Sequence, residues 1–262
     1  MDDSPIIFAR AEGIASIRFN RPHVLNALDE AMVAALRAAV ETAARDERVR
    51  VVVISGEGRG FMAGGDVGRF HAAGPEAPAL VRQLIEPFHE AVVRLAEMPK
   101  PVVASLHGPV AGAGLSIALL ADLAIAADDA QFTLAYARIG TSPDGSATWS
   151  LPRVVGLRKA LELALLADTI DAAEALRLNL VNRVVPRERL EAETEALATR
   201  LAAGPALAYG RIKRLMRTSL DRDLPAQLAE EASAFAACAA SADFAEGVSA
   251  FVGKRPPRFT GR

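Results

Sequence analysis

Several residue types are scarce in this chain, and each scarcity narrows what the protein can be. Cys238 is the only cysteine among 262 residues, and there are four histidines and one tryptophan. A single thiol excludes a disulfide framework and a multi-thiolate metal site within one chain, and the histidines lack metal-ligand spacing. A net charge of −2 likewise gives no electrostatic reason to expect binding to nucleic acid or to an anionic membrane.

Long apolar runs are also missing. The most apolar stretch, Val110 to Ala127, contains two glycines and is interrupted by Asp122. It is therefore typical of a buried segment and not of a membrane span. The first residues, Met1 to Pro5, are acidic and have no apolar signal region. We expect a soluble, cytoplasmic protein.

What the chain does have is apolar residues at regular spacings. It is 51% hydrophobic, which is enough for one sizeable core and a small accessory unit. Alternating or β-branched segments predict strands at 6–10, 14–19, 50–55, 101–106 and 123–126. Helical spacing predicts helices at 28–44, 80–97 and 115–120, with Asp29 placed to start the first. This alternation predicts an α/β fold with a mostly parallel sheet packed against helices.

The character of the chain changes after Val185. Helical candidates follow one another at 188–203, 206–218, 224–240 and 242–251. The breakers Gly204-Pro205 and Asp221 to Pro225 separate them. We predict two parts, an α/β core at 1–200 and a C-terminal helical region at 201–262.

Two glycine-rich loops, 58–66 and 108–114, are the most informative feature, because each follows a buried strand. Glycine lets the backbone adopt positive φ and lets a ligand approach closely. A helix beginning near Gly112 would present free N–H groups to that ligand, and two such groups from different loops form an oxyanion hole. Either loop by itself is more simply a tight turn. Neither has the spacing of a phosphate-binding or dinucleotide-binding loop.

The order of several motifs resembles the crotonase (enoyl-CoA hydratase/isomerase) superfamily over nearly the whole chain. The motifs are Asn20-Arg21-Pro22 with Leu25-Asn26-Ala27-Leu28, Phe61-Met62-Ala63-Gly64-Gly65-Asp66, Lys100-Pro101-Val102-Val103-Ala104 through Gly114, Asp122-Leu123-Ala124, Ala130-Gln131-Phe132, Leu151-Pro152-Arg153 with Gly156, and Glu246-Gly247 to Phe251 with Lys254-Arg255. The resemblance implies a spiral core of ββα units and a C-terminal helical region used for trimerisation, in a homotrimer or a dimer of trimers. It also implies an acyl-CoA thioester substrate, with coenzyme A present only as part of that substrate, no separate cofactor and no metal.

The resemblance also implies roles for residues. The oxyanion donors fall on the backbone N–H groups of Gly65 and Ala113, and alanine keeps the N–H where the family often has glycine. The residues implied to bind the rest of the substrate are Ala63, Gly64, Asp66, Val67, Arg21, Val24, Tyr136 and Lys254. Of these, Lys254 would reach a phosphate or adenine held by a neighbouring subunit.

The chain departs from the hydratases of the family at the residues that perform the reaction. Their two glutamates fall at Ser116 and Tyr136, and hydroxyl groups have ordinary pKa values too far from neutral to replace paired carboxylates. Asp144 lies where isomerases of the family carry a catalytic aspartate, and residues 132–153 resemble isomerases that act on phenylacetyl-CoA epoxides and 3-enoyl-CoAs. One carboxylate can remove the α-proton as a base and return it to the γ-carbon as an acid. We therefore predict an enoyl-CoA isomerase with Asp144 as its acid/base.

Other interpretations stay open. Pro143-Asp144-Gly145 is by itself a strong turn signal, and Tyr136 is equally suited to packing or to hydrogen bonding. A dehalogenase-like reaction, with aspartate as the nucleophile, needs a helix histidine and a tryptophan, and the matching positions are Val93 and Tyr136. His89, one turn before Val93, is then an ordinary exposed or packed helix residue. Hydration of 2-enoyl-CoA and non-catalytic acyl-CoA binding are the alternative functions.

Overall fold

Two sheets organise the protein in the computed structural model, which describes residues 4–261. The larger sheet has the strand order β1-β2-β3-β4-β6-β9, and every neighbouring pair is parallel except β1 and β2. The smaller sheet has the order β5-β7-β8. The strands are β1 (Ile6–Ala11), β2 (Ile14–Phe19), β3 (Val51–Gly56), β4 (Val102–Leu106), β5 (Pro109–Ala111), β6 (Leu123–Ala127), β7 (Gln131–Thr133), β8 (Ile170–Asp171) and β9 (Arg183–Val185). The predicted α/β class with a mostly parallel sheet is confirmed.

Helices lie between the strands and then follow them to the end of the chain. They are α1 (Glu30–Arg45), α2 (Val67–Ala73), α3 (Ala77–Glu97), α4 (Ala113–Leu120), α5 (Ala147–Val155), α6 (Leu157–Leu166), α7 (Ala172–Arg177), α8 (Leu190–Ala202), α9 (Ala206–Thr218), α10 (Leu224–Ala239) and α11 (Ala242–Val252). Asp29 starts α1 as predicted, because its side chain accepts a hydrogen bond from the N–H of Met32.

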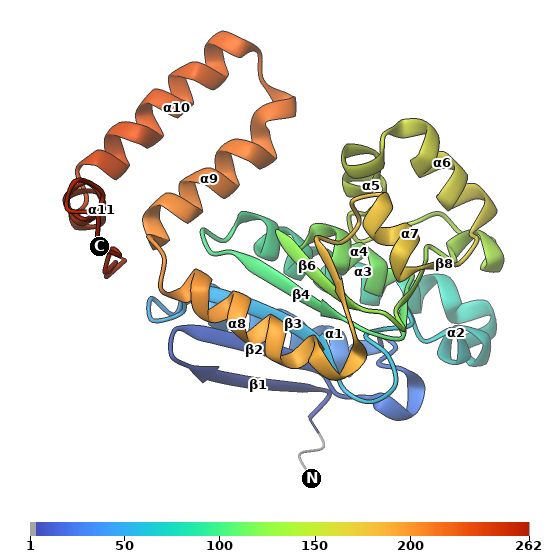
Figure 1. Cartoon of the computed structure of the whole chain (residues 1–262). Coiled ribbons are helices and arrows are strands. Elements are labelled where there is room, and N and C mark those ends of the chain that lie inside the picture. The colour runs from blue at the N-terminus through green and yellow to red at the C-terminus, as the bar shows by residue number, and fades with distance from the viewer. Residues whose placement is uncertain (1–3, 262) are drawn as a thin grey trace.

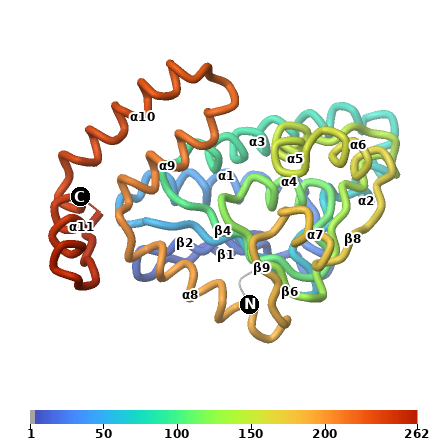
Figure 2. Tube along the Cα trace, turned by 45° about the horizontal axis from the view of Figure 1, so that its top comes forward, coloured from blue at the N-terminus to red at the C-terminus, as the bar shows by residue number. Residues whose placement is uncertain are grey.

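The larger sheet is covered by helices on both faces. Val52 and Ile54 of β3 belong to the main core together with residues of α1 and α3. Val51 and Val53 belong to a second apolar cluster with Ala198 of α8. Successive residues of a strand point to opposite faces, so a continuous apolar run supplies both layers. Figure 2 shows α8 on one side of the sheet and α1 with α3 on the other.

The chain winds as a spiral in which a strand of the larger sheet, a strand of the smaller sheet and a helix follow one another. β4, β5 and α4 form one turn, and β6, β7 and α5 form the next. In the turn before them, Met62 lies between β3 and α2 and pairs in parallel with Val110 of β5. The predicted ββα spiral is therefore present. Its strand β5 lies within residues 108–114, for which the glycines predict only a turn, and its partners come from distant parts of the chain.

The last three helices form a C-terminal arm, α9 to α11, that extends to one side of the molecule at the opposite end from α2 (Figures 1 and 2). Asp122 in the body holds α9 through Lys213 at 2.9 Å and Arg217 at 2.7 Å. Within residues 4–261 no single helix is both long and apolar enough to cross a membrane, and α10 with α11 pass the same test only as a pair bent by 80°. The division of the chain at residue 200 stays a prediction.

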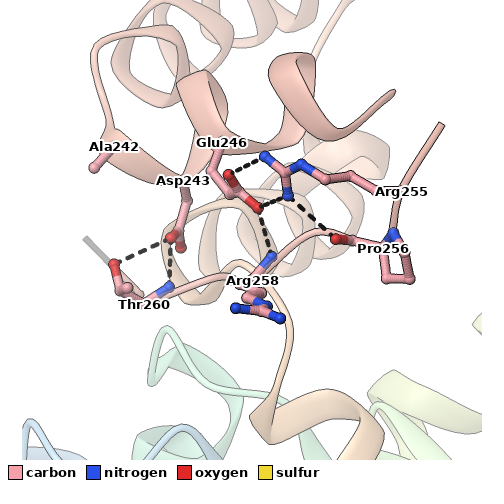
Figure 3. A pocket seen from close by; sticks show the side chains of 7 residues that line it. All are labelled: Ala242, Asp243, Glu246, Arg255, Pro256, Arg258 and Thr260. Atoms are coloured by element: carbon pink, nitrogen blue, oxygen red, sulfur yellow. Dashed lines mark hydrogen bonds and ion pairs between the residues drawn. The ribbon is translucent and has the colours of Figure 1, made fainter. Parts of the chain in front are cut away.

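The segment that follows α11 folds back onto it, as Figure 3 shows. Glu246 of α11 pairs with Arg255 at 2.7 Å, and this pairing, with the N–H of Arg258, lowers the pKa of Glu246 to about 2. Asp243 accepts hydrogen bonds from the N–H groups of Thr260 and Gly261. The carboxylates of Asp243 and Glu246 are thus satisfied by the chain itself, and these contacts hold the last residues against α11.

Candidate active site

The candidate site forms where three parallel segments from successive turns of the spiral end. Met62 pairs with Val110, and Val110 pairs with Phe132. Parallel segments in register bring the residues that follow them to the same edge of a sheet. Gly65 and Ala113, each three residues beyond its paired position, therefore reach that edge together. Tyr136 reaches it from the third segment.

Two glycines allow the first two loops to touch. Gly64 has φ +102 and Gly112 has φ +51, a region that residues with a side chain rarely adopt. A Cβ atom on Gly112 would lie 3.3 Å from the Cα atom of Gly64, and a Cβ atom on Gly64 would lie 3.6 Å from the backbone nitrogen of Ala113. The positive φ at both positions, together with the tight approach at Gly112, therefore disfavours a side chain where the loop that carries Gly65 meets the start of α4.

The N–H groups of Gly65 and Ala113 have no acceptor within residues 4–261. Ala113 is the first residue of α4, where the N–H groups lack an intrahelical partner. The neighbouring N–H groups are used, since that of Gly112 donates to Thr133 and that of Asp66 to Leu28. Ala113 is 5% exposed, and a buried donor without a partner costs about 1–3 kcal/mol. Both groups are therefore available to donate to a ligand.

Both N–H groups lie at a cavity of about 560 Å³ whose lining is mostly apolar. The lining residues are Leu28, Val33, Ala63, Gly64, Gly65, Val67, Phe70, His71, Val81, Leu84, Ile85, Phe88, Gly112, Ala113, Leu134, Ala135, Tyr136, Ile139, Thr141, Ser142 and Asp144. An apolar cavity with a few convergent polar groups is typical of a small-molecule site. Asp144 is the one carboxylate in this lining, and the described residues contain no group of three or more side chains suited to hold a metal ion.

The side chain and backbone of Asp144 are both held by hydroxyl groups. The O–H of Tyr136 donates to Oδ1 of Asp144 at 2.5 Å, and the O–H of Ser116 donates to the backbone oxygen of Asp144 at 2.9 Å. Burial and the adjacent Asp144 carboxylate raise the pKa of Tyr136 above its ordinary value, so Tyr136 stays a donor. A hydrogen bond to an ionised oxygen is stronger than one between neutral groups. The second oxygen, Oδ2, accepts no hydrogen bond within residues 4–261 and remains free for a substrate.

His89 is the site residue that the sequence interpretation missed. Its Nε2 atom accepts a hydrogen bond from the N–H of Gly145 at 3.2 Å and lies 3.9 Å from Oδ2 of Asp144. The helix position that faces Asp144 is therefore His89 and not Val93. Residues one turn apart share a helix face, so periodicity does not separate the two. His89 and Val93 differ instead in their position along the axis of α3. The packing of Phe88 sets which of them lies beside the loop of Asp144, because its ring would lie 2.5 Å from a Cβ atom on Gly145.

Asn26 belongs to the first of the family motifs, and its residue type alone assigns it no role. Its side chain is fully buried, and its amide donates to the backbone oxygens of Glu57, Gly60 and Phe61 at 2.9, 2.9 and 3.1 Å. Its side-chain oxygen accepts from the N–H of Arg21 at 2.8 Å. Asn26 therefore fixes the loop that leads to Gly65. Its partners in that loop lie over thirty residues away, so no local pattern reveals this role.

The predicted binding residues separate into two groups. Ala63, Gly64, Val67 and Tyr136 line the cavity, whereas Arg21, Val24, Asp66 and Lys254 do not. The guanidinium group of Arg21 lies 3.0 Å from Asp29 and 3.4 Å from Asp66, and Asp66 also starts α2 by accepting from the N–H of Arg69. Lys254 follows α11 in the C-terminal arm. The contacts of these residues with a substrate stay predictions.

A ββα spiral whose successive turns converge on free N–H groups and one carboxylate defines an α/β fold of the crotonase class. The chain matches the enoyl-CoA hydratase/isomerase family over residues 9–262, and it belongs to that family. It is 44% identical over 252 residues to a "Probable enoyl-CoA hydratase" of Rhodobacter capsulatus and 38% identical over 253 residues to the 1,2-epoxyphenylacetyl-CoA isomerase of Escherichia coli K12, with 96% of both chains covered in each case.

A solved structure shares the fold over nearly the whole chain. The crystal structure of an enoyl-CoA hydratase from Polaromonas sp. JS666 superposes with a TM-score of 0.92 at 35% identity, covering 97% of this chain and 99% of that one. The resemblance found in the sequence is thereby confirmed. The names of the relatives include both hydration and isomerisation, so membership of the family leaves the reaction to be argued from the site.

Proposed function

We propose that the protein is an enoyl-CoA isomerase that moves the double bond of a 3-enoyl-CoA into conjugation with the thioester, with Asp144 as its acid/base. The observation that carries the proposal is the place of Asp144. It is the one carboxylate in the lining of the cavity among the described residues. It is held by Tyr136 and Ser116, the two positions at which the resemblance places the glutamates of a hydratase.

The reaction needs one proton to be moved and no water to be consumed. The thioester oxygen accepts the N–H groups of Gly65 and Ala113, which acidifies the α-carbon. Oδ2 of Asp144 takes the α-proton, and the electron pair of the broken C–H bond spreads over the dienolate and its oxygen. The protonated Asp144 then delivers a proton to the γ-carbon, and the double bond forms between the α- and β-carbons. The same group serves as base and then as acid.

The remainder of the substrate would extend from the acyl cavity past residues that line it, such as Ala63 and Val67. We assign Ala63, Asp66 and Val67 to its adenine and pantetheine, as the resemblance implies, and Lys254 to a neighbouring subunit's substrate. Assembly as a homotrimer or a dimer of trimers is part of the proposal. Its support is the exposed apolar side chains of the C-terminal arm and the turn after α9, which include Met216, Leu220, Leu224, Phe235, Phe251 and Val252. Burial of such surface favours association.

Replacing Asp144 by asparagine tests the proposal. Asparagine keeps an oxygen that accepts from Tyr136 but cannot take up the α-proton, so kcat for 3-enoyl-CoA isomerisation should fall about 10²–10⁴-fold. The conjugated thioester is followed by its ultraviolet absorbance, and binding of a saturated acyl-CoA should be retained. Full activity of the Asp144→Asn variant would show that Asp144 is not the base.

Hydration of 2-enoyl-CoA is the second candidate, favoured by the name of the Rhodobacter capsulatus relative. The absence of paired carboxylates from the cavity lining argues against it within the described residues. Supplying purified protein with crotonyl-CoA and, separately, with a 3-enoyl-CoA separates the two. If the protein adds water to crotonyl-CoA faster than it shifts the double bond of the 3-enoyl-CoA, the proposed function would be hydration and not isomerisation. Acyl-CoA binding without turnover or α-proton exchange would indicate a non-catalytic binding protein.

A further inference from the structure

His89 is held in one tautomer by its contact with Gly145. A backbone N–H can only donate, so Nε2, the atom that accepts from Gly145, carries no proton, and the ring proton of neutral His89 is on Nδ1. The Nε2 lone pair is thereby kept on the side of the ring that faces the loop of Asp144. The same bond ties this loop to α3, next to the packing of Gly145 on Phe88.

The two oxygens of Asp144 have different surroundings. Oδ1 is engaged by Tyr136 at 2.5 Å, and Oδ2 lies 3.9 Å from Nε2 of His89. An approach of about 1 Å brings the latter pair into hydrogen-bonding range. The approach becomes favourable once Oδ2 carries a proton, because a carboxylic acid O–H is a donor and Nε2 is an acceptor.

His89 also connects Asp144 with water. The side chain of His89 is 46% exposed, that of Asp144 is 25% exposed, and Ser116 is fully buried. Tyr136 retains its proton, because burial and the Asp144 carboxylate raise its pKa. Among the side chains that contact Asp144 in the described residues, His89 is therefore the one that combines an acceptor nitrogen with access to solvent. The Nε2 lone pair that accepts the N–H of Gly145 must exchange that partner for Oδ2 before it can take up a proton.

The geometry points to His89 as a positioning residue that fixes the loop of Asp144 and carries protons between Oδ2 of Asp144 and water. This inference rests on the proposed isomerase function. After Asp144 has taken the α-proton, Nε2 releases the N–H of Gly145 and accepts the proton from Oδ2. The imidazolium then gives the proton on Nε2 to a water molecule, which restores the original tautomer and the hydrogen bond from Gly145. A proton from water follows the reverse path to Oδ2 and then to the γ-carbon. No other reactant is needed.

The consequence is a competition between two fates of the abstracted proton. Direct delivery by Asp144 carries the substrate's own α-proton to the γ-carbon, whereas the path through His89 replaces it with a proton from water. In deuterated water the two fates are separated by mass spectrometry of the product. A purely structural role of His89 would change the rate without changing this ratio.

Two variants separate positioning from proton transfer. Glutamine at position 89 offers an amide oxygen to the N–H of Gly145 but cannot relay a proton. In His89→Gln, exchange relative to internal return should therefore fall at least about tenfold, by a larger factor than kcat. Leucine offers neither, so His89→Leu should lose the exchange and also about threefold to tenfold in kcat, as expected for one lost hydrogen bond. Because His89 is nearly half exposed, both variants should fold, which thermal unfolding checks.

Each outcome has a defined meaning. Exchange in His89→Gln at the wild-type ratio would overturn the proton path, as would complete internal return in the wild type. Unchanged kcat in His89→Leu would overturn the positioning role. Failure of the proposed function looks different, since the wild type would then neither isomerise 3-enoyl-CoA nor exchange its α-proton, and the inference would fall with it.

Discussion

The two halves of the candidate site use different kinds of chemical group. The proposed oxyanion half uses backbone N–H groups, those of Gly65 and Ala113, and is positioned by the register of paired segments. The acid/base half uses side chains, chiefly Asp144 with Tyr136. A backbone donor survives substitution of its own side chain, as alanine at 113 illustrates, whereas a side-chain acid does not. In the proposed function, the first half therefore stabilises the thioester enolate, and the second decides which reaction follows.

Of the variants that compare the two halves, the one that removes a backbone donor should lose the most kcat. Ala113 is the first residue of α4, a position at which proline is well tolerated because its missing N–H has no intrahelical partner. Ala113→Pro should therefore preserve the helix and remove the donor. Loss of one oxyanion donor lowers kcat about 10²–10³-fold. Steady-state isomerisation and α-proton exchange should fall together.

The matched control for this variant is Ala113→Gly, which retains the N–H group and should retain kcat within about threefold. Circular dichroism of both variants checks that α4 is intact. If Ala113→Pro folds and turns over like the wild type, the N–H of Ala113 does not stabilise the dienolate, and the division of the site into two halves would be wrong.

A smaller effect is expected from the side-chain half when Asp144 keeps its carboxylate but loses its strongest partner. Tyr136→Phe removes the O–H that donates to Oδ1. Because the raised pKa of Tyr136 keeps that hydroxyl protonated, the loss is that of a hydrogen bond to a charged group, about 1.5–3 kcal/mol, or roughly tenfold to a hundredfold in kcat. Binding of a saturated acyl-CoA, measured by calorimetry, should change little. A variant with normal kcat and weakened binding would place Tyr136 in acyl recognition instead.

The two halves also differ in how far the sequence predicts them. Gly64 and Gly112 mark a close approach of two backbones, and each follows an apolar run. The two glycine-rich loops therefore follow from local pattern, and the resemblance adds which of their N–H groups are the proposed donors. Apolar runs predict strands β3 and β4 in the same way. They do not predict strand β5, because only parallel pairing with Met62 and Phe132 makes it a strand.

The side-chain half depends on contacts between distant segments. The resemblance points to Asp144, yet the hydrogen bond from Gly145 that brings His89 to it spans fifty-six residues. The role of Asn26 likewise arises from a loop more than thirty residues away. Periodicity reports which face of a helix is buried, but the height at which one helix meets a particular loop is set by packing of the whole core.

The smallest effect is expected at Ser116, which contacts the backbone of Asp144 and not its carboxylate. Ser116→Ala removes the donor to the backbone oxygen of Asp144 at 2.9 Å, a neutral hydrogen bond worth about 0.5–1.5 kcal/mol, so kcat should fall about twofold to tenfold. Ser150→Ala is the matched control, because Ser150 is also buried but bonds to Ser146 and does not contact Asp144.

Ser116 and Tyr136 lie 3.3 Å apart, so combining Ser116→Ala with Tyr136→Phe should give a loss that departs from the sum of the single losses. A larger loss in Ser116→Ala than in Tyr136→Phe would mean that the loop backbone, and not the carboxylate, is the main point at which this half of the site is held.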